Sequence, residues 1–244
     1  MKPKLSYTIW FSQRTGSTLL CQALTSTEIA GKPSELMSND NLLTKYQLNN
    51  YVELQKRLWQ LGSTSNQVFG VKTGIYNPYL HNLLDTLKKF PGYNPQSKNP
   101  VEIWENAFPN CKHIYMTRRN KVRLAVSWWR AIQTQEWHRL QGKSAKSVNL
   151  EDKYSYEAIN HLHAECSMRE AAIQDFFDSG SITPLTIVYE DFILNYGATI
   201  KNVLNYLDLP NADETLVAPP PLQKLADNVL EKWVERFRQE KQQG

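Results

Sequence analysis

The chain has 244 residues, of which 41% are hydrophobic and 21% charged, and this is long enough for one large domain with a substantial core. Its net charge of +4 suits anionic small molecules but is too weak and scattered for a nucleic-acid-binding protein. The three cysteines are far apart and in no C-x-x-C arrangement, which favours reduced thiols over a disulfide scaffold. We find no apolar signal region and no apolar run of membrane-spanning length in the sequence. We therefore expect a soluble, cytoplasmic protein with a single domain over residues 1–244.

The first informative stretch is a polar turn between a predicted strand at 5–12 and a predicted helix at 18–27. The turn holds one glycine (Gly16), one arginine (Arg14) and three hydroxyl groups. Unpaired backbone N–H groups and the helix dipole favour an anion at such a helix N-terminus, and an arginine adds side-chain donors. A simple capped helix would give the same pattern. The strict P-loop pattern is not met, because the first glycine and the lysine are missing, which argues against an ordinary nucleotide triphosphatase or kinase.

A turn with Gly31 and Pro33 follows, and Glu35 comes directly after it. Two interpretations of Glu35 stay open from this local pattern. The carboxylate is either a general base beside the anion site or an ordinary glutamate in the first turn of the next helix.

The middle of the chain alternates between helical and strand patterns. We predict, in order, a helical segment over 40–62, a short buried strand over 68–72 that ends in Lys72, a helix over 79–90, a surface loop over 91–95 and a short helix over 101–108.

The second informative stretch is a predicted strand at 112–117 followed by Arg118 and Arg119 and then by a helix predicted over 121–138. Ligands of open α/β sheets bind at the C-terminal ends of the strands, so the two arginines are a candidate anion clamp. Ser127 follows Arg119 by eight residues, and the two share a ligand only if Arg119 reaches along the helix. The alternative is a solvated arginine pair and an ordinary helix serine.

The remaining elements continue the alternation, which predicts an α/β fold with a central, mostly parallel sheet flanked by helices. We predict, in order, a polar loop over 141–147 that is either a lid or a linker, a helix over 155–178, a strand over 182–188 that starts after Pro184, a helix over 196–207, a stiff proline spacer over 218–221 and a last helix over 222–239. The sequence holds no cluster of residues with metal-ligand spacing.

At these motifs the chain resembles sulfotransferases that use 3′-phosphoadenosine-5′-phosphosulfate (PAPS). Residues 13–18 resemble their 5′-phosphosulfate loop, and Arg119 with Ser127 resembles their 3′-phosphate motif. Within these enzymes the chain is most similar to the bacterial trehalose 2-sulfotransferase (NodH-like) group. The shared segments are the loop at 12–20, the G-x-P-x-E turn at 31–35, the segment 117–134, Tyr189-Glu190-Asp191 and the helix pattern from Gln223 to Trp233. The resemblance covers nearly the whole chain and implies a sulfotransferase fold similar to that of P-loop NTPases.

The resemblance also implies a donor site and a mechanism. Glu35 matches the catalytic base, and Arg14 stands where the wider superfamily has a lysine. The product nucleotide would be 3′,5′-ADP, and no metal would be needed. We expect partial burial to raise the pKa of Glu35. The implied donor-binding residues are Gln13, Arg14, Thr15, Gly16, Ser17, Thr18, Arg119, Ser127 and, less securely placed by its motif, Lys224.

The acceptor implied by the resemblance is a carbohydrate hydroxyl, on trehalose or on a glucose-containing glycolipid, and the family suggests a homodimer. Aromatic and polar residues that follow the second motif are candidates to contact it. The candidates are Lys72, Gln133, Trp137 and His138. Two other functions remain as alternatives: a P-loop-like, ATP-dependent small-molecule kinase, and a non-catalytic nucleotide- or sugar-binding module.

Overall fold

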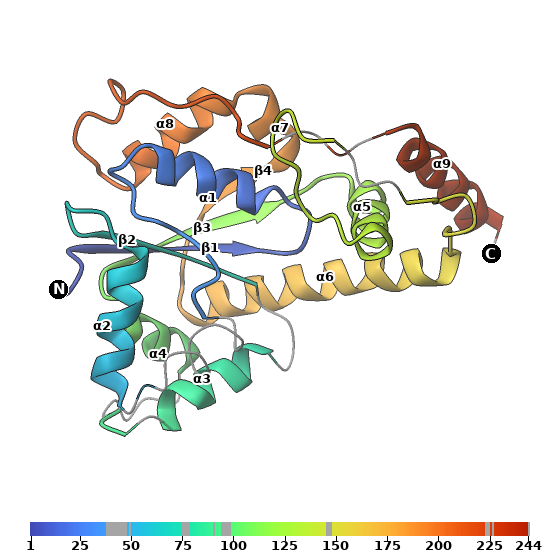
Figure 1. Cartoon of the computed structure of the whole chain (residues 1–244). Helices are drawn as coiled ribbons and strands as arrows, with labels where there is room; N and C mark the ends of the chain where they lie inside the picture. Colours follow the sequence, from blue (N-terminus) through green and yellow to red (C-terminus); the bar gives the residue numbers. More distant parts are fainter. Residues whose placement is uncertain are drawn as a thin grey trace.

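The computed structural model describes residues 1–37, 48, 50–74, 79–89, 91–93, 99–144, 148–222, 225 and 227–243. Figure 1 shows how its helices and strands are arranged. In chain order they are β1 (Leu5–Phe11), α1 (Ser17–Ser26), α2 (Tyr51–Gly62), β2 (Val68–Thr73), α3 (Tyr79–Lys89), α4 (Pro100–Ala107), β3 (Cys111–Thr117), α5 (Lys121–Thr134), α6 (Tyr156–Ser179), β4 (Leu185–Val188), α7 (Tyr189–Leu194), α8 (Tyr196–Tyr206) and α9 (Asn228–Gln243).

The described strands form one sheet in the order β2-β1-β3-β4, and every neighbouring pair is parallel. The register places Ile9 opposite both Lys72 and Ile114. This arrangement confirms the predicted α/β fold with a parallel central sheet. Because the strands are parallel, their C-terminal ends lie at one edge, where the loop after β1 and the arginines after β3 come together.

Alternation along β1 explains the layers on the two faces of this sheet. Tyr7 and Ile9 pack in one buried cluster with residues of α1 and α8. Trp10 points to the opposite face, where its ring centroid lies 5.0 Å from that of Trp104 and 4.5 Å from that of Phe176. Figure 1 shows α1 and α8 on one side of the sheet and α2, α4 and α6 on the other.

A further buried cluster joins α5, α6 and α9 beyond the end of the sheet (Figure 1). The last helix was predicted over 222–239, but it begins at Asn228 and continues to Gln243. Asp227 explains the start, because its carboxylate accepts the N–H of Leu230 at 3.0 Å and so caps the first turn. Leu222 instead forms an isolated bridge with Leu140.

The helix predicted over 121–138 ends at Thr134. Gln135 adopts a left-handed conformation with φ of 53°, which stops the helix. The chain after it is held by Glu136, a buried carboxylate whose Oε2 lies 2.6 Å from Nη2 of Arg139. The residues between them therefore turn back toward the edge of the sheet instead of continuing the helix.

Several predicted segments fall partly outside the described residues. These parts are 40–47 and 49 of the first helical segment, Phe90, 94–95 of the surface loop, 145–147 of the polar loop and three positions near the start of the predicted last helix. The described part of the helical segment begins at Tyr51, with Asn50 as its N-cap.

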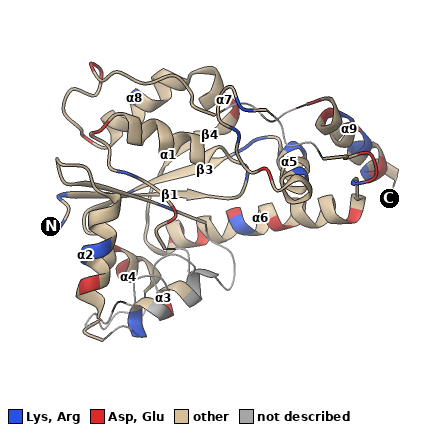
Figure 2. Cartoon of the chain, viewed as in Figure 1, with Lys and Arg blue, Asp and Glu red and all other residues tan. Residues whose placement is uncertain are grey.

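Charge is distributed over the whole described fold, and Figure 2 shows Lys and Arg interspersed with Asp and Glu. Among the described residues, no helix combines the length and the apolar character needed to cross a membrane. The three cysteines are free thiols, as their spacing predicts, and Cys21 and Cys166 are buried.

Candidate functional site

The loop after β1 exposes the N-terminus of α1. Arg14 and Gly16 both have positive φ, of 66° and 84°, and the first intrahelical bond joins the N–H of Leu20 to the carbonyl of Gly16 at 3.2 Å. The N–H groups of Ser17 to Leu19 therefore have no acceptor within the helix. A Cβ at Gly16 would lie 2.6 Å from Cδ2 of Tyr189, so only glycine fits here. The loop is thus shaped for a group that accepts backbone N–H donors.

Arg14 is a cation held inside this site. Its Nε donates to Oγ of Ser127 at 3.1 Å, and its Nη1 donates to the carbonyl of Trp137. Burial lowers the pKa of Arg14 to about 10, and the like charges of Arg118 and Arg130 contribute to the lowering. Among the described residues no carboxylate forms an ion pair with Arg14. A bound anion would relieve this uncompensated positive charge.

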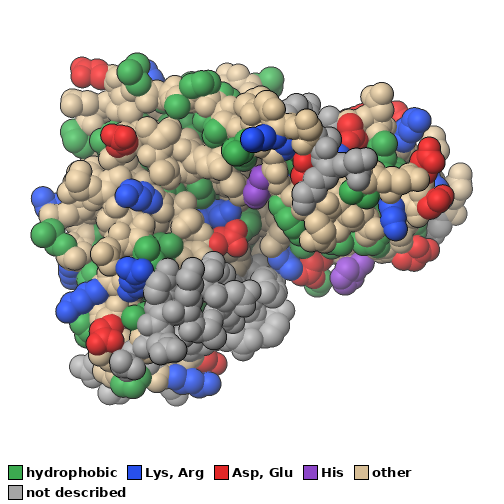
Figure 3. Space-filling view, in the orientation of Figure 1, with side chains coloured by type: hydrophobic (Ala, Val, Ile, Leu, Met, Phe, Trp, Pro, Cys, Tyr) green, Lys and Arg blue, Asp and Glu red, His purple; other side chains and the backbone are tan. Residues whose placement is uncertain are grey.

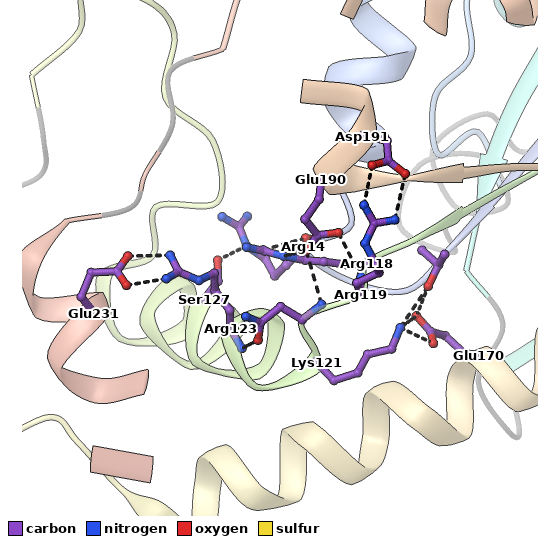
Figure 4. A network of polar contacts seen from close by, with 12 residues as sticks. Arg14, Arg118, Arg119, Lys121, Arg123, Ser127, Glu170, Glu190, Asp191 and Glu231 are labelled. Carbon is purple, nitrogen blue, oxygen red and sulfur yellow. Dashed lines mark hydrogen bonds and ion pairs between the residues drawn. The ribbon is translucent and has the colours of Figure 1, made fainter. Parts of the chain in front are cut away.

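The two arginines after β3 have different environments, as Figure 4 shows. Arg118 is buried, its guanidinium lies 4.6 Å from the ring centroid of Tyr189, and its Nε is 3.4 Å from Oε1 of Glu190. The Arg119 side chain is 59% exposed and pairs with Asp191. The backbone N–H of Arg119 donates to Glu190 at 3.0 Å. Arg118 is therefore fixed beside the loop, whereas Arg119 faces outward.

Helix α5 carries Ser127 to the loop. The helix starts after Asn120, whose side chain accepts the N–H of Arg123 at 2.9 Å. The hydroxyl of Ser127, further along α5, then meets Arg14 (Figure 4). Ser127 therefore contacts Arg14, whereas the side chain of Arg119, which is expected from the sequence to share a ligand with Ser127, pairs with Asp191.

The turn at Gly31 places Glu35 beside β2. Gly31 has φ of 70°, and a Cβ there would lie 2.8 Å from the backbone nitrogen of Gly70. The chain after the turn is held by the N–H of Lys72, which donates to the carbonyl of Ser34 at 2.9 Å. Glu35 is thereby next to Lys72, and its Oε1 lies 2.8 Å from Nζ of Lys72.

Lys72 connects Glu35 to the loop. Its side chain is only 8% exposed, and Nζ also donates to Oγ1 of Thr18 at 3.1 Å. Nε2 of His138 lies 3.3 Å from the same hydroxyl. Desolvation lowers the pKa of His138 to about 4, and the charges of Arg14 and Lys72 contribute, so His138 is neutral at pH 7. The Glu35 side chain is 54% exposed, so its ion pair with Lys72 constrains it more than burial does.

These groups line one cavity of about 690 Å³, within the range of small-molecule sites. Figure 3 shows a hollow between the body around the sheet and the part that contains α5 and α9, and a histidine, basic side chains and a carboxylate gather there. The described lining holds a single carboxylate, Glu35. Its cationic side chains are Arg14, Lys72, Arg118, Arg123 and Arg139.

Most of the residues predicted from the sequence meet in this cavity. Those in its lining are Gln13, Arg14, Gly16, Ser17, Thr18, Glu35, Lys72, Ser127, Trp137 and His138. Thr15 is buried and is not part of the described lining, and its hydroxyl donates to the carbonyl of Ser12 at 2.8 Å. Gln133 and Arg119 are not part of the described lining. Lys224 lies outside the described residues.

The structure adds residues that the sequence did not single out for this site. Arg123 and Tyr189 line the cavity. Of the two arginines in the candidate anion clamp, Arg118 is in the described lining and Arg119 is not. The sequence pointed to Tyr189 only through the Tyr189-Glu190-Asp191 segment, which is one of the segments of the resemblance. Among the described residues, no group of three or more His, Cys, Asp or Glu side chains is arranged to hold a metal ion.

The chain is similar in sequence and in fold to known proteins. The family model described as Stf0 sulphotransferase matches residues 6–240. The trehalose 2-sulfotransferase of Mycolicibacterium smegmatis is 25% identical over 97% of this chain and 96% of its own length. The trehalose 2-sulfotransferase of Mycobacterium tuberculosis is 23% identical over 96% of this chain and 94% of its own. A sulfotransferase crystal structure from Alicyclobacillus acidocaldarius superposes with a TM-score of 0.53 at 13% identity, covering 97% of this chain and 91% of that one, which shows a shared fold.

Proposed function

The chain belongs to the Stf0 sulphotransferase family, and from this premise we propose that it moves a sulfuryl group from PAPS to a carbohydrate hydroxyl. In this proposal Glu35 is the base, and Arg14 is the cation at the transferred group. The observation that carries the proposal is the cavity itself. It joins the N-terminus of α1, the uncompensated Arg14 and the Glu35 carboxylate in one space.

The donor suits the charge of this cavity, because PAPS carries anionic groups at two positions of its ribose. Arg14 and the N–H groups at the start of α1 would hold the 5′-phosphate and the sulfate. Ser127 and Arg119 would hold the 3′-phosphate. To bind this phosphate, Arg119 must break its ion pair with Asp191. The two side chains are 59% and 56% exposed, and ion pairs between exposed side chains contribute little to stability, so breaking this pair costs little. Lys224 is proposed to close over the same phosphate.

The chain's own residues would carry the chemistry. Bound PAPS supplies a sulfuryl group attached to a phosphate that leaves. Glu35 accepts the proton of the acceptor hydroxyl as that oxygen attacks sulfur. Lys72, 2.8 Å from Glu35, fixes the carboxylate in place. Arg14 keeps its proton, so it stabilises the charge of the leaving phosphate electrostatically, together with the N–H donors of α1.

The acceptor we propose is a neutral carbohydrate, either trehalose or a glucose-containing glycolipid. The support is that the two mycobacterial relatives are trehalose 2-sulfotransferases. Trp137 and His138 lie at the cavity beside Thr18, where an aromatic face and a ring nitrogen are available to a sugar. We further propose a homodimer, which light scattering of the purified chain tests.

Thermal unfolding with nucleotides tests the donor site. We expect 3′,5′-ADP to raise the melting temperature more than 5′-AMP, which lacks the 3′-phosphate, and more than ATP. Arg119→Ala should reduce the effect of 3′,5′-ADP toward that of 5′-AMP. Asp191→Asn is the matched control, because it removes the partner of Arg119 and keeps the arginine. A full response of Arg119→Ala to 3′,5′-ADP would contradict the assignment of Arg119, and no response of the wild-type protein would contradict the donor site.

A further inference from the structure

The two segments proposed to bind the donor lie beyond the part of the sheet that holds their strands together. Backbone pairing between β1 and β3 ends at Phe11 and Met116. The first donor motif, the loop at 13–18, and the second donor motif, the segment 119–127, both follow these residues in the chain. The hydrogen bonds of the sheet therefore do not fix one motif relative to the other. Two adjacent residues of α6 contact both sides instead.

Glu170 joins the start of the first motif to the second. Its Oε1 accepts the hydroxyl of Ser12 at 3.4 Å and that of Thr117 at 2.9 Å, each one residue beyond the last backbone pair. Lys121, within the second motif, donates to the same oxygen at 2.6 Å (Figure 4). The Glu170 side chain is only 15% exposed and Ser12 is buried, so water competes little for these contacts. Glu170 thus continues from α6 the connection that the backbone of the sheet ends.

Arg169 makes a second connection between the motifs. Its Nη1 donates to Oε1 of Gln13 at 2.6 Å, and its guanidinium lies 4.8 Å from the ring centroid of Trp128. Gln13 belongs to the first motif, and Trp128 directly follows the second motif on α5. Glu165, one turn earlier on α6, accepts from Nε of Arg169 at 2.7 Å and so orients the guanidinium. Both Gln13 and Trp128 line the cavity of the candidate site.

We propose that Arg169 and Glu170 are positioning residues that set the separation of the two donor motifs. Neither residue is part of the described cavity lining, so both act through the residues they hold. The inference rests on the proposed donor site, in which the first motif holds the 5′-phosphate and sulfate and the second holds the 3′-phosphate. A ligand with phosphates at both positions must engage both motifs at once, so its affinity depends on their separation. A ligand with one phosphate needs only one motif.

The opposite charges of the two residues separate this role from an electrostatic one. Glu170→Ala removes a negative charge near a site for anions, whereas Arg169→Met removes a positive charge. If the charges alone mattered, the first substitution would strengthen binding of the 3′-phosphate and the second would weaken it. Loss of positioning weakens that binding in both variants.

Isothermal titration calorimetry of the full chain with 3′,5′-ADP and with 5′-AMP tests the inference. The ratio of the two dissociation constants measures the preference for the ligand with both phosphates. We expect this preference to fall about tenfold in Glu170→Ala and in Arg169→Met, because each substitution breaks hydrogen bonds of a charged group that hold the motifs. A loss of stability alone would lower the melting temperature and leave the ratio unchanged, since both nucleotides bind the folded protein.

Two more variants complete the design. Asp175→Asn removes an exposed carboxylate from the same helix, outside the described cavity lining, and as the matched control it should keep the wild-type ratio. Glu170→Asp keeps the charge and withdraws the carboxylate, so it should also lower the ratio. It takes the place of Glu170→Ala if that variant does not fold.

The outcomes separate this inference from the proposed function. A lowered ratio in both variants, with an unchanged ratio in Asp175→Asn, supports the positioning role. A wild-type ratio in either variant, or shifts of opposite sign in the two, overturns the positioning role while the donor site stands. A wild-type protein that binds the two nucleotides equally overturns the donor site, and the positioning role with it.

Discussion

Replacing Arg14 with methionine is expected to stabilise the ligand-free protein and to abolish its response to the product nucleotide. Burial and like charges lower the pKa of Arg14 to about 10. Since one pKa unit corresponds to about 1.4 kcal/mol, holding Arg14 charged costs the folded state about 3 kcal/mol. At pH 7 the group is protonated in the folded and the unfolded state, so the cost applies in full.

The substitution also removes the hydrogen bonds from Arg14 to Ser127 and to the carbonyl of Trp137. Each such bond contributes about 1 kcal/mol, so the expected net gain in the free energy of unfolding is about 1 kcal/mol. For a chain of this size that raises the melting temperature by about 3 °C. Differential scanning calorimetry with and without 3′,5′-ADP measures both effects on one sample.

Arg123→Met is the matched control, because it removes the same charge from the same cavity but from an arginine that is paired with Glu231. We expect no stabilisation from it. Two results would contradict this prediction: a melting temperature of Arg14→Met no higher than that of the wild type, or a full response of Arg14→Met to 3′,5′-ADP. Either result would mean that Arg14 is not an uncompensated cation whose charge a bound anion neutralises.

Three further predictions follow from individual contacts. Gly16→Ala forces a Cβ to within 2.6 Å of the Tyr189 ring at a φ of 84°. It should therefore lower the free energy of unfolding, measured by urea titration, by about 1–3 kcal/mol and weaken the thermal response to 3′,5′-ADP. Wild-type stability and a wild-type response in this variant would contradict the tight fit at Gly16. Burial lowers the pKa of His113 to about 4 against about 6.5 in the unfolded chain, so stability is complete above pH 6.5 and falls by up to about 3 kcal/mol as the pH drops to 4. His113→Gln should flatten the pH–stability curve between pH 6.5 and 4. An unchanged slope would mean that other titratable groups cause the loss of stability in this range. Lys72→Met should lower kcat more than tenfold, because Glu35 then loses the ion pair that fixes its position. Lys72→Arg keeps a cation at this position and should retain part of the rate. Equal kcat values in the wild type and both variants would exclude a positioning role for Lys72.

The sequence predicted those parts of the fold and site that are set by neighbours along the chain. The run of β-prone residues in β1 and the helical pattern after Gly16 are local features, and so the strand, the turn and the helix N-terminus were predicted correctly. The parallel sheet followed from the alternation of strands and helices. Once the sheet is parallel, the ends of β1 and β3 must meet at one edge, which is why both motifs reach one site.

The parts that were not predicted depend on contacts between distant segments. The helix pattern continues past Thr134, and only the buried Glu136 and its partner Arg139 show why the chain turns back there. Arg118 and Arg119 look equivalent in the sequence. Their different orientations are decided by the segment from Tyr189 to Asp191, about 70 residues further along the chain.

The same limit applies to Glu35. Its partner Lys72 comes from β2, and the two meet only because the turn at Gly31 packs against that strand. Conversely, Gln133 was a candidate because it follows the second motif on the predicted helix, yet it is not part of the described cavity lining. A helix pattern gives the face of a residue but not the element that covers that face.

The most direct test of the account is the transfer of radiolabelled sulfate from PAPS to trehalose by the wild type and by Glu35→Gln. We predict transfer by the wild type and a rate reduced by about 10²- to 10⁴-fold in Glu35→Gln, because the amide cannot accept the proton of the attacking hydroxyl. The variant should keep the full thermal response to 3′,5′-ADP, because the donor groups are unchanged. Wild-type rates in Glu35→Gln, or no transfer of label by the wild type to trehalose or to other sugars and glycolipids, would contradict the central claim.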